Sequence, residues 1–142
     1  MLLPAFLAVL LSVAACRRGT LAPEPLPVDR VSCARCGMVV SDLSTAAQAV
    51  SRGEETRFYD DIGCLAEDRA VAGGTWRFFV HAGTAPDAWL PAESAFFARG
   101  AGATPMNYGI RAYVFSAQAA QSDGEHRARR WADVTAGERA AR

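Results

Sequence analysis

The chain has 142 residues, 15 basic and 15 acidic side chains and a formal net charge of zero, and 51% of its residues are hydrophobic. A neutral chain has no electrostatic footprint for nucleic acid, so we expect no nucleic-acid partner, and the apolar fraction excludes a disordered chain. All basic residues are arginine, which excludes Schiff-base and P-loop lysine chemistry. The length predicts one small domain, and the four cysteines are too few for a disulfide-dense scaffold.

Residues 1–15 are largely apolar and uncharged, and they end on small residues directly before Cys16. They predict an export signal peptide, because a membrane-spanning helix needs roughly 20 apolar residues. The V-A-A-C sequence at residues 13–16 resembles the lipobox of bacterial lipoproteins, which implies that Cys16 is acylated. We therefore expect a lipid-anchored protein of the bacterial cell envelope that faces the periplasm. Arg17 favours the outer membrane, and an uncleaved hydrophobic tail is the alternative.

Both ends of the mature chain are predicted to lie outside the folded domain. Residues 16–30 hold three prolines and no apolar periodicity, which is typical of a flexible tether between lipid and domain. Residues 135–142 offer no apolar side chains worth burying, so we expect a disordered tail. The folded domain is therefore predicted to span residues 31–134.

Strands and short helices alternate along this predicted domain. A hairpin is expected from strands at residues 46–50 and 56–59, followed by a helix at residues 62–71 that Asp60 or Asp61 caps. The remaining expected elements are a strand at residues 75–81, a helix at 91–98, a strand at 110–115, a helix at 116–123 and an edge strand at 130–134. The order strand, strand, helix occurs twice, which indicates an internal ββα-type repeat and an α+β fold.

The densest group of chemically active residues is C-A-R-C-G-M at residues 33–38, where two thiols and a thioether lie close together. These soft donors select Cu(I) and, to a lesser degree, zinc. Gly37 leaves the backbone free to curl, so that the side chains of Cys36 and Met38 could converge on one ion. The spacing alone leaves open a redox dithiol using Cys33 and Cys36, half of a structural zinc site, or a plain disulfide.

Three further candidates lie at the ends of predicted elements, where functional residues concentrate. F-Y-D-D-I-G-C-L at residues 58–65 supplies Cys64, and T-P-M at residues 104–106 supplies Met106. His81 ends a predicted strand, and its imidazole suits copper. A buried small residue is the alternative for Cys64, and an ordinary polar residue is the alternative for His81. With Cys16 acylated, the domain keeps three cysteines, so at least one thiol stays unpaired within the chain.

Taken in order, these motifs resemble the NosL family of lipoprotein copper chaperones, which are associated with maturation of nitrous oxide reductase. The resemblance rests on C-x-x-C-G-M, an A-x-Q-x-V strand, F-Y-D-D-I-G-C-L and T-P-M ahead of an apolar strand, and it runs from residue 33 to residue 115. The lipobox fits it as well. The chain departs from the family by having Asn107 and Tyr108 before Gly109, where family members tend to be glycine-rich.

The resemblance implies an α+β fold with two ββαβ-like halves that binds one Cu(I) through sulfur. Cys36, Met38 and Met106 match the family's ligands, Cys33 is either a second thiolate or a disulfide partner of Cys36, and Cys64 has no clear role. The protein would deliver copper by ligand exchange, without catalysing a reaction. Its implied partners are a copper-accepting envelope enzyme such as nitrous oxide reductase and a membrane copper exporter or ABC-type complex.

Two other functions fit the same residues. A thiol-disulfide redox lipoprotein would use the pair of Cys33 and Cys36, although its C-x-x-C motif would be expected to open a helix after a core strand, whereas this one follows a proline-rich segment. A non-metallic interaction module would use the cysteines only as a disulfide and would have no copper affinity in either redox state.

Overall fold

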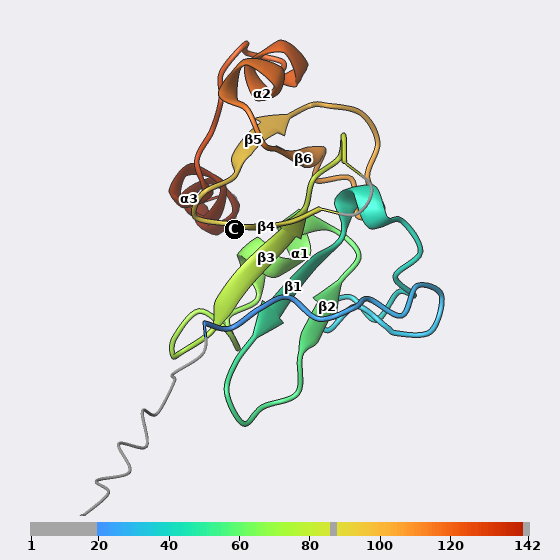
Figure 1. The fold of residues 1–142 in the computed structure, drawn as a ribbon. Helices are drawn as coiled ribbons and strands as arrows, with labels where there is room; N and C mark the ends of the chain where they lie inside the picture. The colour runs from blue at the N-terminus through green and yellow to red at the C-terminus, as the bar shows by residue number, and fades with distance from the viewer. Residues whose placement is uncertain (1–19, 86–87, 141–142) are drawn as a thin grey trace, which may run out of the picture.

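Six strands and three α-helices make up the computed structural model, which describes residues 20–85 and 88–140 (Figure 1). In chain order the elements are the short 3-10 helix η1 (Leu43–Thr45), β1 (Ala47–Val50), β2 (Arg57–Tyr59), α1 (Ile62–Glu67), β3 (Arg77–His81), β4 (Trp89–Pro91), β5 (Phe96–Arg99), β6 (Ile110–Tyr113), α2 (Ser116–Ser122) and α3 (Trp131–Ala140). The α+β fold class is confirmed. The predicted signal peptide and Cys16 lie outside the described residues. No helix in the described part of the chain is long and apolar enough to cross a bilayer.

The larger sheet has the strand order β2-β1-β3-β4, and each pair of neighbouring strands is antiparallel. All four side chains of β1 are buried. In Figure 1, α1 lies behind this sheet, and the N-terminal segment crosses in front of it. Small residues in β1, such as Ala47 and Ala49, leave room for α1 to pack close to the strand.

The N-terminal segment is attached to the sheet and does not act as a free tether over its described length. The buried side chain of Gln48 accepts a hydrogen bond from the Glu24 N–H at 2.8 Å and donates one to the Glu24 carbonyl at 3.0 Å. Leu26 packs against the core, and the N–H of Asp29 donates to the Val40 carbonyl at 2.9 Å. The predicted tether is therefore wrong for residues 24–30, because a buried amide and a core contact hold them to the domain.

The second half of the chain repeats the first in reduced form. β5 and β6 form a two-stranded antiparallel sheet, and Phe97 of β5 makes a single further antiparallel bridge to Arg129. The order β6, β5, Arg129 matches the order β2, β1, β3, and α2 follows β6 as α1 follows β2. The first half is thus a complete ββαβ unit, whereas in the second half the last strand shrinks to one bridge.

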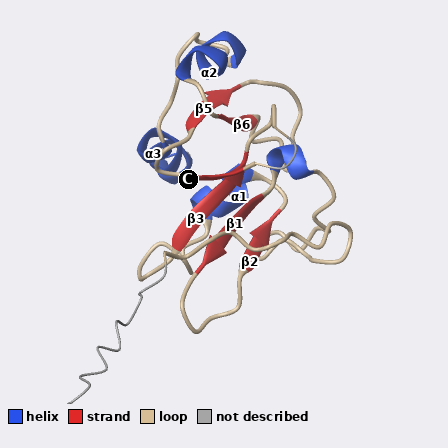
Figure 2. Cartoon of the chain, in the orientation of Figure 1, coloured by secondary structure: helices blue, strands red, loops and turns tan. Residues whose placement is uncertain are grey.

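The helix predicted at residues 91–98 is wrong, because this stretch contains the end of β4, one turn and most of β5 (Figure 2). The N–H groups of Ser94 and Ala95 both donate to the Pro91 carbonyl, which makes a single helical turn. The chain then becomes extended at Phe96, where aromatic residues favour a strand. A proline followed by one helical turn can lead into a helix or into a strand. Here the pairing of β5 with β6 selects the strand.

The edge strand predicted at residues 130–134 and the disordered tail predicted from residue 135 are replaced by α3 (Figure 2). The helix starts where Asp133 Oδ2 accepts a hydrogen bond from the Arg130 N–H at 2.8 Å. Trp131, Val134 and Glu138 are spaced three and four residues apart, so they share one helix face. Val134 and Glu138 are buried, which makes α3 part of the core.

Trp131 joins the two sheets. Its ring centroid lies 6.0 Å from that of Phe78 in β3 and 5.7 Å from that of Phe97 in β5. Glu138, on the same face of α3, forms an ion pair with Arg99 at the end of β5. The C-terminal helix therefore holds the two halves together.

Candidate metal centre

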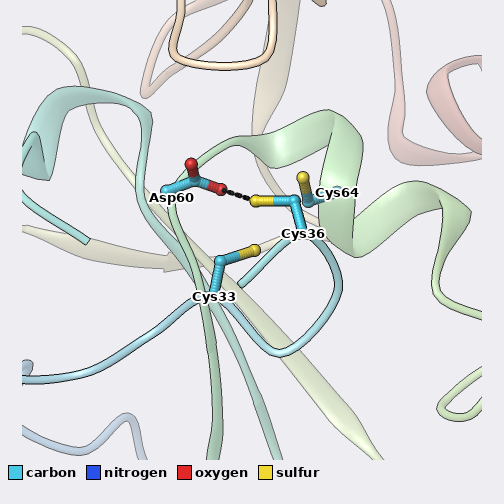
Figure 3. Close-up of side chains that lie close together, drawn as sticks. All are labelled: Cys33, Cys36, Asp60 and Cys64. Carbon is cyan, nitrogen blue, oxygen red and sulfur yellow. Dashed lines mark hydrogen bonds between the residues drawn. The ribbon is translucent and has the colours of Figure 1, made fainter. Parts of the chain in front are cut away.

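The cysteines of the C-x-x-C-G-M motif lie in a tight turn at residues 33–38, which we call the cysteine turn. The N–H of Cys33 donates to the Met38 carbonyl at 2.7 Å, so the chain reverses within six residues. Gly37 has a φ of +80°, a left-handed conformation that glycine adopts at low cost. Figure 3 shows the side chains of Cys33 and Cys36 converging on one region.

The other members of the cluster come from the junction between β2 and α1. Asp61 is the N-cap of α1, because its Oδ1 accepts a hydrogen bond from the Gly63 N–H at 3.0 Å. Asp60 precedes the cap, and Cys64 lies in the first turn of the helix. The hydroxyl of Thr45 donates to the Asp60 carbonyl at 2.8 Å, which fixes the backbone at this junction.

Three sulfurs and one carboxylate meet between these two segments (Figure 3). One ligand atom each from Cys33, Cys36, Asp60 and Cys64 lies within 4.8 Å of all the others. Cys36 Sγ donates to Asp60 Oδ1 at 3.3 Å, and the three cysteines are free thiols. Cys36 is half-buried and the other three are buried, so the cluster opens towards solvent on the side of Cys36.

The thiols of the cluster differ in acidity. The pKa of Cys33 is lowered, mainly because the thiol of Cys64 donates a hydrogen bond to its sulfur and also because the backbone N–H of Cys36 donates to it, although burial opposes the shift. Burial raises the pKa of Cys36, and the hydrogen bond to Cys33 raises that of Cys64. A cation bound by all three sulfurs would displace the protons of those that are thiols.

Asp60 is the member of the cluster that the sequence favoured as a helix cap and not as a ligand. Its side chain is 1% exposed, and its Oδ2 atom has no hydrogen-bond partner among the described residues. A buried carboxylate oxygen without a partner is costly, and a nearby cation removes that cost. The motif did contain a signal, because only one of two adjacent aspartates can cap a helix, which leaves the other available.

The remaining predicted ligands lie elsewhere or on the surface. His81 is buried at the end of β3, where its ring meets the Trp89 ring edge-on at 5.4 Å, and it is not a member of the cluster. Met38 ends the cysteine turn with 46% of its surface exposed. Met106 is 38% exposed. Its backbone N–H donates at 3.1 Å to Oδ2 of Asp61, the residue that follows Asp60 in the chain.

The fold and the cluster define a small α+β domain with a group of three cysteines and one aspartate that could hold a metal ion. No model of a protein family, no curated protein and no solved structure matches the chain.

Proposed function

We propose that this protein binds one Cu(I) ion and delivers it to a copper enzyme of the cell envelope, as the resemblance to the NosL family implies. The observation that carries the proposal is the meeting of three free thiols within 4.8 Å of one another beside a buried carboxylate. Thiolates are soft donors that favour Cu(I) and, to a lesser degree, zinc over hard cations. Net binding would release protons from the thiols, which couples copper affinity to pH.

The ligands differ in accessibility, and this suits a protein that gives its metal away. Cys33 and Cys64 are 3% and 0% exposed and form the fixed part of the site. Cys36 is half-buried, and Met38 and Met106 are exposed residues. In ligand exchange, an acceptor's donors would replace the exposed sulfurs first, so that no free ion is released.

The expected lipid anchor on Cys16 completes the proposal. It would place the domain at the surface of an envelope membrane, within reach of a copper exporter or ABC-type complex and of an acceptor such as a nitrous oxide reductase. Since residues 24–30 are held against the sheet, only the chain between Cys16 and Glu24 is left as a tether. At about 3.5 Å per residue, eight residue steps span at most about 28 Å.

A redox function of Cys33 and Cys36 is the weaker candidate. A thiol that attacks disulfides needs a thiolate that its partner can reach. Here the cysteine with the lowered pKa, Cys33, is the buried one, and the more accessible Cys36 has a raised pKa. A rate assay for thiol–disulfide exchange separates the two functions, and we expect it to give no rate above that of a free thiol.

Anaerobic titration of the reduced full-length chain with Cu(I), in competition with a colorimetric chelator, tests the proposal. We expect a single site per chain, and we expect Cys36→Ala and Cys64→Ser each to lower the affinity by about 100-fold or more, since even outer-shell partners of a metal contribute 10–100-fold. Glu54→Gln, in the exposed turn between β1 and β2, is the control and should leave the affinity unchanged. Unaltered binding by Cys36→Ala or Cys64→Ser contradicts the proposal.

A further inference from the structure

A single buried carboxylate ties the loop of Met106 to the start of α1. Asp61 is 0% exposed, and its Oδ2 accepts hydrogen bonds from the Thr104 hydroxyl at 2.6 Å and from the Met106 N–H at 3.1 Å. Thr104 Oγ1 in turn accepts from the Gly109 N–H at 3.0 Å, which closes residues 104–109 into a compact loop. We call this segment the methionine loop.

A second contact holds the methionine loop to the same helix. A Cβ atom added to Gly63 would lie 2.1 Å from Cγ of Tyr108, so the ring of Tyr108 occupies the space that a side chain at Gly63 would need. The Tyr108 hydroxyl hydrogen-bonds to Glu67, and Glu67 forms an ion pair with Arg35 of the cysteine turn. The start of α1 and its end are thus joined to the methionine loop, and the end of α1 is also joined to the cysteine turn.

The geometry points to Asp61, acting through Thr104, as a positioning residue that holds Met106 at the metal site. This inference rests on the proposed function, in which Met106 is one of the exposed sulfur ligands. Oδ1 of Asp61 fixes the helix that carries Cys64, and Oδ2 fixes the loop that carries Met106, so one side chain sets the relation between an inner and an outer ligand. A loop held in this way slows the loss of copper to a competing ligand.

Thr104→Val tests this role without disturbing the helix cap, because the hydrogen bond from Gly63 to Asp61 does not involve Thr104. The valine lacks the hydroxyl that bonds to a charged acceptor, so we expect Cu(I) to pass from the full-length protein to a colorimetric chelator about tenfold faster. Thr104→Ser keeps the hydroxyl, and we expect it to restore release to within about twofold of the wild-type rate.

Gly63→Ala reaches the same loop by a different route. Alanine is more favourable than glycine inside a helix, so α1 is not weakened, but its methyl group displaces the ring of Tyr108. We expect release of Cu(I) to accelerate as it does in Thr104→Val.

Met106→Leu supplies the readout that a merely structural role would not change. It removes the thioether at similar size, so release should accelerate, and the double variant Thr104→Val/Met106→Leu should release Cu(I) no faster than Met106→Leu alone. Additive effects of the two substitutions, or wild-type release rates in both Thr104→Val and Gly63→Ala, overturn the inference while leaving the cysteine site intact. A wild-type chain that binds no Cu(I) instead contradicts the proposed function itself.

Discussion

At the scale of single residues, Asp60 and Asp61 are adjacent yet serve different purposes. Asp61 caps α1 and anchors the methionine loop, whereas Asp60 turns its carboxylate towards the three thiols. The sequence motifs indicated Cys33, Cys36 and Cys64 as candidate ligands, because a thiol is a soft metal donor whatever fold surrounds it. They could not predict Asp60, since a carboxylate before a helix is read first as a cap and only the tertiary structure shows which of the two is free.

Substitution of Asp60 by asparagine should separate metals of different character. Asparagine keeps the size of the side chain but loses its charge, and Zn(II) depends on oxygen ligands more than Cu(I) does. We expect Asp60→Asn to lower Zn(II) affinity by about tenfold and Cu(I) affinity by less than about threefold, in competition titrations with chelators for each ion. Asp29→Asn, in an exposed loop, is the control and should change neither. Equal losses for both ions would mean that Asp60 acts on the fold.

At the scale of elements, the first half was predictable and parts of the second were not. β1, β2 and β6 followed from residues that favour strands, and α2 was predicted almost to its ends. β4, β5 and α3 were missed because their structure depends on distant partners. Phe97 pairs with both Ala112 and Arg129, and Trp131 packs between β3 and β5. Neither of these long-range contacts can be read from the local sequence.

Asp123 organises the second half. Its side chain is fully buried, and its carboxylate accepts hydrogen bonds from the backbone N–H of Arg99 at 2.8 Å, from that of Glu125 at 2.9 Å and from Nε of Arg129 at 2.9 Å. Burial opposes ionisation, but the Arg129 guanidinium and the backbone donors outweigh it and hold the pKa of Asp123 below its usual range. This carboxylate joins the end of α2 to β5 and to the bridge at Arg129.

Because the pKa of Asp123 is lower in the folded state, its ionised form stabilises the fold at neutral pH, and this contribution is lost as the pH falls below about 4 towards the folded-state pKa. We expect Asp123→Asn to lower the free energy of unfolding by about 2 kcal/mol at pH 7. In urea titrations the gap to wild type should narrow between about pH 5 and pH 3. Glu54→Gln, in the exposed turn between β1 and β2, should leave the free energy unchanged. A gap that is constant with pH would rule out the charge as its cause.

At the scale of the whole molecule, the folded unit extends beyond both predicted boundaries. Gln48 holds residue 24 at one end, and Trp131 and Val134 bury α3 at the other. Proline-rich and charged segments resemble linkers in composition, so only their tertiary contacts reveal them as parts of the domain. Under the proposed lipid anchor on Cys16, this leaves only the short chain between Cys16 and Glu24 as a tether.

X-ray absorption at the copper edge, on full-length protein loaded anaerobically with one equivalent of Cu(I), shows directly whether sulfur binds the metal. A copper site in the cysteine cluster would give a first coordination shell of sulfur, from which Cys64→Ser removes one sulfur scatterer. A shell dominated by nitrogen or oxygen would contradict the assignment of this cluster as the copper site. A spectrum of Cys64→Ser identical to that of the wild type would contradict it as well.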